Sequence, residues 1–169
     1  MPLAFLTACT RQSPWRALPS QRPAPAGTDP PADPYFVWMN APEADSCIVS
    51  GVAKGDGAGF RRWTADRFSL VFKPLPEGTW RARVRFDLHQ RFLDELGPFT
   101  LTLSVNGRTL ASQTYSSPGD AELTAGVPPG LLKPGEPARI DVACDRVWIS
   151  PNDGARLSVR LVAAGFVRP

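Results

Sequence analysis

The strongest constraint on the fold is a strict alternation of apolar and polar side chains over residues 79–89. A period of two places the apolar side chains on one face of a β-strand. The apolar set is Trp80, Ala82, Val84, Phe86 and Leu88, and the polar face carries Arg81, Arg83 and Arg85. The stretch therefore predicts a strand with one buried face. Its polar face is either a solvated outer surface or a basic stripe for an acidic glycan or a phosphate group.

The same alternation recurs along the chain, over residues 68–72, 99–105, 138–144 and 156–166. Asn106-Gly107 is a strong hairpin signal, because a type I′ turn needs positive φ at both central residues. The only helical segment that we expect is one or two turns over residues 90–97. Short strands separated by turn signals every 8–12 residues predict an all-β fold, an antiparallel sandwich or barrel of about eight to ten strands.

Length and composition fit one domain with an N-terminal extension. The chain has 169 residues, 43% of them hydrophobic, which is enough for one real core. Residues 10–34 are rich in proline and predict an extended linker, so we place the folded domain at residues 35–169. The net charge of +3 is a mild excess spread along the chain, and no nucleic-acid-binding module is present, so we expect no nucleic-acid partner.

Residues 1–9 end in Leu6-Thr7-Ala8-Cys9, which resembles the lipobox of bacterial lipoproteins. The resemblance implies a truncated signal peptide, lipidation at Cys9 and a domain held at the bacterial cell envelope, on the outer membrane or the periplasmic face. The apolar stretch before the box is shorter than the usual 7–15 residues. A chance match therefore stays open as the alternative.

Groups for catalysis are scarce in this sequence. His89 is the only histidine, and no GxSxG nucleophile turn accompanies it. One histidine and three scattered cysteines give no zinc set, and no pair of carboxylates stands out for glycoside hydrolysis. We therefore expect no enzyme, with a hydrolase the least favoured function. Cys47 and Cys144 either pair as a disulfide in an oxidising envelope or remain separate buried thiols.

Trp63 and Trp148 stand where predicted strands meet polar loops, a position that suits sugar binding. An aromatic ring stacks on sugar C–H groups while planar polar side chains satisfy the hydroxyls. Structural packing is the alternative for Trp63. The candidate ligand-binding residues are Arg61, Arg62, Trp63, Asp66, Trp148, Asn152 and Asp153.

Four segments occur in an order that resembles a jelly-roll, galactose-binding-like domain of bacterial polysaccharide and glycosyltransferase proteins. They are Phe60-Arg61-Arg62-Trp63-Thr64, Val105-Asn106-Gly107, residues 127–132 (VPPGLL) and residues 150–157 (SPNDGARL). The resemblance implies a jelly-roll β-sandwich used in carbohydrate or envelope work without catalysis of its own. It also implies structural calcium as the one candidate cofactor, for which Asn152 and Asp153 would supply oxygen ligands.

Two functions follow from these patterns. The first is a non-catalytic, lipid-anchored domain that binds a glycan or envelope polysaccharide. The alternative is a structural or assembly subunit that binds a protein partner through an exposed sheet edge or through the face of Arg81, Arg83 and Arg85.

Overall fold

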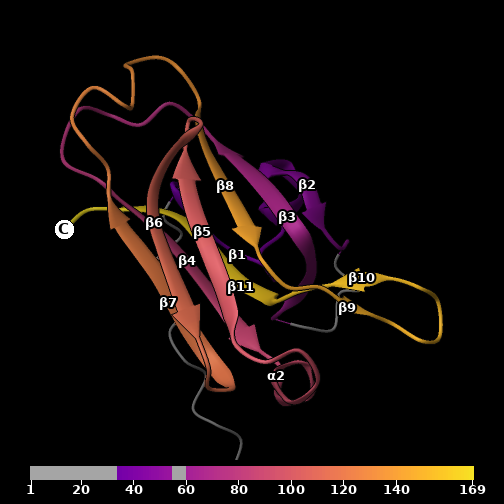
Figure 1. The fold of residues 1–169 in the computed structure, drawn as a ribbon. Helices are drawn as coiled ribbons and strands as arrows, with labels where there is room; N and C mark the ends of the chain where they lie inside the picture. The colour runs from indigo at the N-terminus through magenta and orange to yellow at the C-terminus, as the bar shows by residue number, and fades with distance from the viewer. Residues whose placement is uncertain (1–33, 55–59) are drawn as a thin grey trace, which may run out of the picture. The chain divides into compact units, whose positions relative to one another are not determined.

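The computed structural model describes residues 34–54 and 60–169, and it shows a two-layer antiparallel β-sandwich (Figure 1). The chain divides into residues 1–30 and 31–169, and every described residue lies in the second part. Cys9 lies outside the described residues. No described helix is both long and apolar enough to cross a membrane.

One layer is built on β4 (Arg81–Leu88), whose alternation dominates the sequence. β4 pairs with β7 (Gly119–Gly126) on one side and with β11 (Arg160–Val167) on the other. β1 (Phe36–Trp38) adds to β11 further along the strand. Gly165 is required in β11, since its φ is +152° and a Cβ there would lie 2.1 Å from the Tyr35 carbonyl oxygen.

The second layer places β3 (Arg62–Phe72) between β2 (Ile48–Val52) and β8 (Ala138–Cys144), followed by β5 (Phe99–Val105) and the edge strand β6 (Arg108–Tyr115). The first residues of β3 also pair with β11, so β3 joins the two layers. Asn106 (φ 46°) and Gly107 (φ 80°) form the predicted tight turn between β5 and β6.

The core lies between the layers and consists of the side chains that the alternation assigned inward. All four inward residues of β5 are fully buried. The inward residues of β4 are also buried, with at most 2% exposure. The rings of Phe86 and Tyr115 meet across the layers, with centroids 5.0 Å apart, as do those of Phe72 and Phe166 at 5.5 Å. The predicted fold class, an antiparallel jelly-roll β-sandwich, is therefore confirmed.

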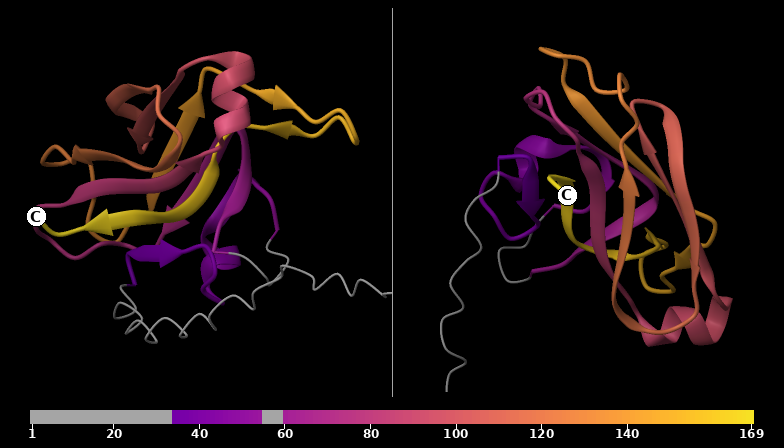
Figure 2. Two further views of the ribbon diagram at one scale, coloured as in Figure 1. Left: turned by 90° about the horizontal axis from the view of Figure 1, so that it is seen from below. Right: turned by 90° about the vertical axis from the view of Figure 1, so that its left-hand side faces the viewer.

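Shorter elements occupy the ends of the sandwich. They are α1 (Ala44–Cys47), α2 (Gln90–Leu96), and the two-residue strands β9 (Trp148–Ile149) and β10 (Arg156–Leu157). Figure 2 shows the β9–β10 hairpin extending away from the layers beside α2. The sequence predicted one strand over residues 156–166. That prediction was wrong, because Leu157 pairs with β9, whereas Arg160 and the residues after it pair with β4.

The disulfide between Cys47 and Cys144 is not formed, and both are free cysteines. Ile48 pairs with Leu70 and Leu70 with Ile140, so β3 separates β2 from β8. The two cysteines extend in opposite directions from that row, which puts them roughly 15 Å or more apart at about 3.3 Å per residue. A disulfide needs Cα atoms within about 7 Å.

Candidate functional site

The aromatic side chains at the α2 end of the sandwich form a stack, which we call the aromatic column. Phe92 of α2 is its centre and is 3% exposed. The Trp63 ring stacks on one side of Phe92, with centroids 5.2 Å apart, and the Trp148 ring on the other side at 4.9 Å. The structure thus brings both predicted tryptophans together through a residue that the sequence did not single out.

Two arginines close the ends of the aromatic column. The guanidinium of Arg160 lies 5.5 Å from the centroid of Trp63, and that of Arg91 lies 5.0 Å from Trp148. Each tryptophan therefore has Phe92 and a cation against its ring. The column braces α2 against β3 and β9, so both tryptophans, which are half-buried, have a structural role; ligand contact by either ring stays a prediction.

Glu95 fixes the outer end of the column. Its carboxylate accepts hydrogen bonds from Arg91 Nε (2.6 Å) and from the indole Nε1 of Trp148. These bonds lower the pKa of Glu95 below its usual value, and the bond from Arg91 has the larger effect.

His89 has a structural task at the start of α2. Its Nδ1 accepts a hydrogen bond from the backbone N–H of Arg91 (3.3 Å), which caps the helix. Its ring packs beside Trp63 and Phe92. The histidine is used here as a cap within an aromatic cluster.

The other predicted ligand residues occupy different places. Arg62 is 9% exposed, and it donates to the Met39 carbonyl (2.8 Å) and pairs with Asp45, so it holds β1 and α1 against β3. Asp66 forms a longer ion pair with Arg156 (3.7 Å) of β10.

Asn152 and Asp153 lie on the exposed loop that joins β9 to β10. The Asp153 carboxylate bonds to the side chain of Ser150 and accepts from the backbone N–H of Ala155, and these two bonds lower its pKa in that order. Within the described ranges, no group of three or more His, Cys, Asp or Glu side chains is placed to hold a metal. Calcium at this loop stays a prediction.

Arg61 belongs to a separate exposed group at the start of β3, which we call the Phe60 site. The Phe60 ring is 69% exposed, whereas Trp63 nearby is packed into the column. Arg61 Nη2 lies 2.8 Å from Asp120 Oδ1 of β7, and both side chains are accessible, at 41% and 61%. An exposed aromatic residue next in the chain to an exposed cation, which is paired with a carboxylate, offers a stacking group and hydrogen-bonding groups for hydroxyls.

The Phe60 site lies next to a row of paired residues that crosses four strands. Trp63 of β3 pairs with Arg160 of β11, which pairs with Asp87 of β4, which pairs with Asp120 of β7. Asp87 is 5% exposed and accepts from Arg160 Nε at 2.6 Å. Asp120 therefore sits on a rigid row, which fixes the carboxylate that Arg61 reaches.

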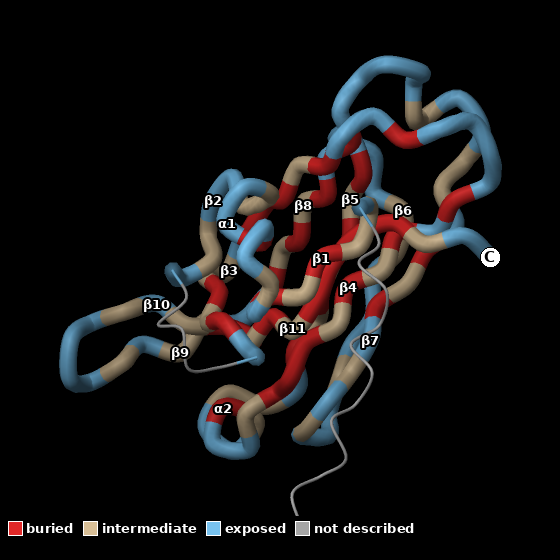
Figure 3. The backbone as a smooth tube through the Cα atoms, turned by 180° about the vertical axis from the view of Figure 1, so that it is seen from behind, coloured by how far each residue is buried: buried red, intermediate tan, exposed pale blue. Residues whose placement is uncertain are grey.

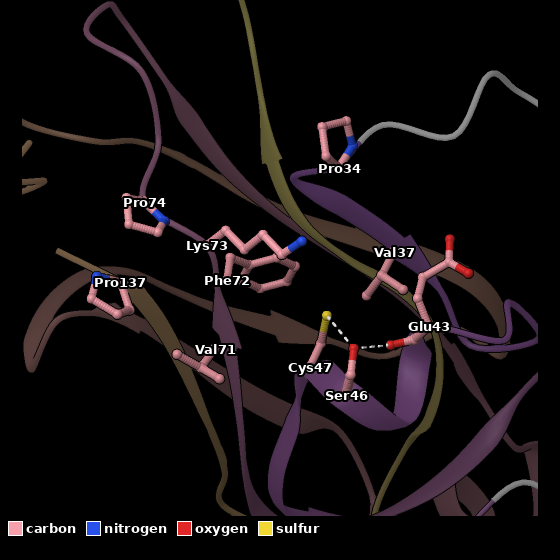
Figure 4. A pocket seen from close by; sticks show the side chains of 10 residues that line it. All are labelled: Pro34, Val37, Glu43, Ser46, Cys47, Val71, Phe72, Lys73, Pro74 and Pro137. Carbon is pink, nitrogen blue, oxygen red and sulfur yellow. Dashed lines mark hydrogen bonds between the residues drawn. The ribbon is translucent and has the colours of Figure 1, made fainter. Parts of the chain in front are cut away.

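A pocket of about 620 Å³ lies on another part of the domain, near α1 (Figure 4). Its walls are mainly apolar, and its polar groups are Glu43, Ser46, Cys47 and Lys73. Ser46 Oγ donates to the Glu43 carbonyl at 2.6 Å and lies 4.0 Å from Cys47 Sγ. Partial burial is the main cause of a raised Cys47 pKa, so the thiol is not an activated nucleophile.

Fold and surface together define a β-sandwich with an exposed aromatic and charged site at one end. No family model and no curated protein matches this chain. Among solved structures it is similar to a family 35 carbohydrate-binding module from an environmental isolate, at 17% identity and a TM-score of 0.44, covering 72% of this chain and 86% of that one.

A second similar structure is a family 35 module, Xyl-CBM35, in complex with a glucuronic acid-containing disaccharide, at 12% identity and a TM-score of 0.46, covering 79% and 93% of the two chains. A third is a family GH115 4-O-methyl-α-glucuronidase, at 12% identity and a TM-score of 0.48, where 72% of this chain spans 16% of that enzyme.

Proposed function

We propose that this chain is a non-catalytic carbohydrate-binding domain that holds its glycan at the Phe60 site. Two observations carry the proposal: the Phe60 side chain is 69% exposed, and the next residue, Arg61, forms an exposed ion pair with Asp120. On a sugar the Phe60 ring would cover an apolar face, while Arg61 and Asp120 hydrogen-bond the hydroxyls.

The non-catalytic part of the proposal rests on how the reactive groups are used. The Nδ1 of His89 is engaged as a helix cap, and burial raises the pKa of both described cysteines. The carboxylates of Asp87 and Asp120 are each paired with an arginine. Such paired carboxylates suit recognition better than proton transfer.

Glycan-array binding of the full chain tests the proposal. We expect the wild type to bind at least one class of glycan and Phe60→Ala to weaken that binding about tenfold, as expected for a lost stacking ring worth about 1–1.5 kcal/mol. Val49→Ala is the matched control, because Val49 is also exposed (49%) but lies on β2, where the neighbouring Ile48 pairs with Leu70 near the other end of β3. Arrays with no bound glycan, or equal binding by both variants, would overturn the proposal.

The envelope location is part of the same proposal and is supported by the sequence Leu6-Thr7-Ala8-Cys9. A lipid on Cys9 would tether the domain through the proline-rich residues 10–34. Incorporation of labelled palmitate in a bacterial host should be lost in Cys9→Ser. Absence of label in the wild type, or unchanged label in the variant, would count against the anchor.

The assembly function remains the second candidate. β6 ends its sheet, and most of its residues are exposed, so its outer edge is open to a strand from a protein partner. This function would be favoured if a proline within β6 abolished binding of a protein partner while Phe60→Ala left that binding unchanged.

A further inference from the structure

A second surface lies on the outer face of the layer that contains β1, β11, β4 and β7. Figure 3 shows the backbone of this layer from the side opposite to the view of Figure 1. We call this surface the arginine face. Its residues follow from the strand register: Phe36 pairs with Gly165 and Gly165 with Arg83, while Trp38 pairs with Ala163 and Ala163 with Arg85. Directly paired residues project to the same side of a sheet. Two aromatic and two guanidinium side chains thus share one face.

The charge of the β4 arginines is largely uncompensated. Arg81, Arg83 and Arg85 alternate with buried residues of β4, so their Cα atoms are spaced by about 7 Å along the strand. Arg83 pairs with Glu122 of β7 at 3.2 Å. Among residues 34–54 and 60–169, no carboxylate lies within ion-pair distance of Arg81 or Arg85. The register also puts Asp87 and Asp120 on this face, where they pair with Arg160 and Arg61, so Arg81 and Arg85 are the cations of β4 left without a carboxylate partner among the described residues.

The aromatic side chains lie next to these cations. The Arg85 guanidinium lies 5.1 Å from the centroid of the Trp38 ring, and the Phe36 and Trp38 rings meet edge to face at 6.1 Å. Ala163 between them is fully buried although it is not part of the core cluster, so Trp38 and Arg85 cover it from outside. Small residues at the centre keep the surface shallow.

We propose that the arginine face binds a linear acidic polysaccharide whose carboxylates lie along β4. A guanidinium holds a carboxylate through two parallel hydrogen bonds, and regularly spaced arginines match a chain with regularly spaced charges. Trp38 contacts the Arg85 guanidinium and helps to hold it in place, and Phe36 adds apolar surface for a sugar ring. A bilayer fits less well, because neither aromatic residue is among the exposed large hydrophobic residues that would insert into it.

This site goes beyond the proposed function, because it uses none of the groups of the Phe60 site and selects for charge. The probe is polygalacturonate, and its control is the same polymer with its carboxylates methyl-esterified, which keeps the sugar chain and removes the charge. We expect the full chain to bind polygalacturonate at low salt in affinity electrophoresis, to lose affinity as salt is raised, and to bind the ester at least tenfold more weakly.

The test variant is Arg81→Gln with Arg85→Gln, and the matched control is Arg108→Gln with Arg146→Gln. Both pairs lower the net charge equally, and both control arginines are exposed and lie outside this face. We expect the test variant to lose at least tenfold in affinity for polygalacturonate while the control pair loses less than threefold. Arg81→Lys with Arg85→Lys keeps the charge and should bind at an intermediate level, which also guards against misfolding of the Gln variant.

Four results would overturn the proposal: equal binding of the esterified polymer, equal loss in the control pair, tighter binding of single-stranded DNA, or tighter binding of anionic vesicles than of polygalacturonate. Phe60→Ala separates the two sites. If it abolishes array binding and leaves polygalacturonate binding intact, the sites are independent, as proposed. If it abolishes both, the arginine face is not a site of its own.

Discussion

Replacing Phe92 by alanine should strongly destabilise the domain, because Phe92 is the centre of the aromatic column. The side chain is 3% exposed and stacks on Trp63 and Trp148 at interplanar angles of 28° and 18°. Removing a buried phenylalanine costs about 3–5 kcal/mol, and each aromatic pair contributes about 0.5–1.5 kcal/mol of it beyond area burial. Against a total stability of about 5–15 kcal/mol, that is a large share.

A leucine at position 92 separates packing from stacking. Phe92→Leu keeps much of the apolar volume and loses both ring stacks, so we expect a cost of about 1–3 kcal/mol. Urea unfolding measures the free-energy changes, and thermal unfolding should show about 3–5 °C of lowered Tm per kcal/mol in a domain of this size. The near-UV circular dichroism of the tryptophans should weaken in both variants, because their stacked environment is lost.

Phe60→Ala is the control for this experiment. Phe60 has the same side chain but is 69% exposed, so its removal should change stability by less than about 0.5 kcal/mol. A cost below about 1 kcal/mol for Phe92→Ala, or an equal cost for Phe60→Ala, would show that Phe92 is not the centre of a stabilising stack.

Three further predictions concern stability and thiol chemistry. Arg62→Met should cost about 1–3 kcal/mol in urea unfolding, since it leaves the carbonyl of the buried Met39 without its donor, whereas Asp45 is exposed and is solvated by water once the pair is lost; a cost below about 0.5 kcal/mol would contradict its structural role. Because folding lowers the Glu95 pKa, the stabilisation from ionised Glu95 should be present above about pH 4.5 and lost as the pH falls through the pKa of the folded state. Glu95→Gln should therefore flatten the pH dependence of the unfolding free energy over that acidic range. An unchanged pH dependence would count against the Arg91–Glu95–Trp148 contacts. Mass spectrometry after alkylation under non-reducing denaturing conditions should find Cys47 and Cys144 as free thiols. In the folded state at pH 7 both should be alkylated slowly, because burial raises their pKa values. A disulfide-linked peptide pair would show that the strand order is wrong.

The sequence predicted the core well because strand periodicity is a local property. Phe68, Leu70 and Phe72 lie inward in β3 as their spacing indicated. The same phase, extended back along β3, reaches Arg62, which is buried. Its even spacing from Phe68 was a usable signal, but an arginine is rarely buried unless it is paired, and its partners come from residues 39 and 45.

The site was harder to predict, because its contacts join residues far apart in the chain. The stack of Trp63, Phe92 and Trp148 depends on how α2 and β9 fold against the start of β3, and no periodicity records that. Asp120 was missed for the same reason, since it reaches Arg61 only through the order of β3, β11, β4 and β7.

The aromatic column also favours Phe60 over Trp63 as the residue of the proposed glycan site. Trp63 and Trp148 are held between Phe92 and an arginine, so a ligand could stack on either only by displacing a cation that already contacts the ring. Displacing it would forfeit a contact worth about 0.5–1 kcal/mol at an exposed site, before any sugar contact is formed. Phe60 carries no such penalty, and the column beneath it holds the start of β3 in place. Structural use of the tryptophans thus fixes the backbone from which the exposed ring and Arg61 are presented.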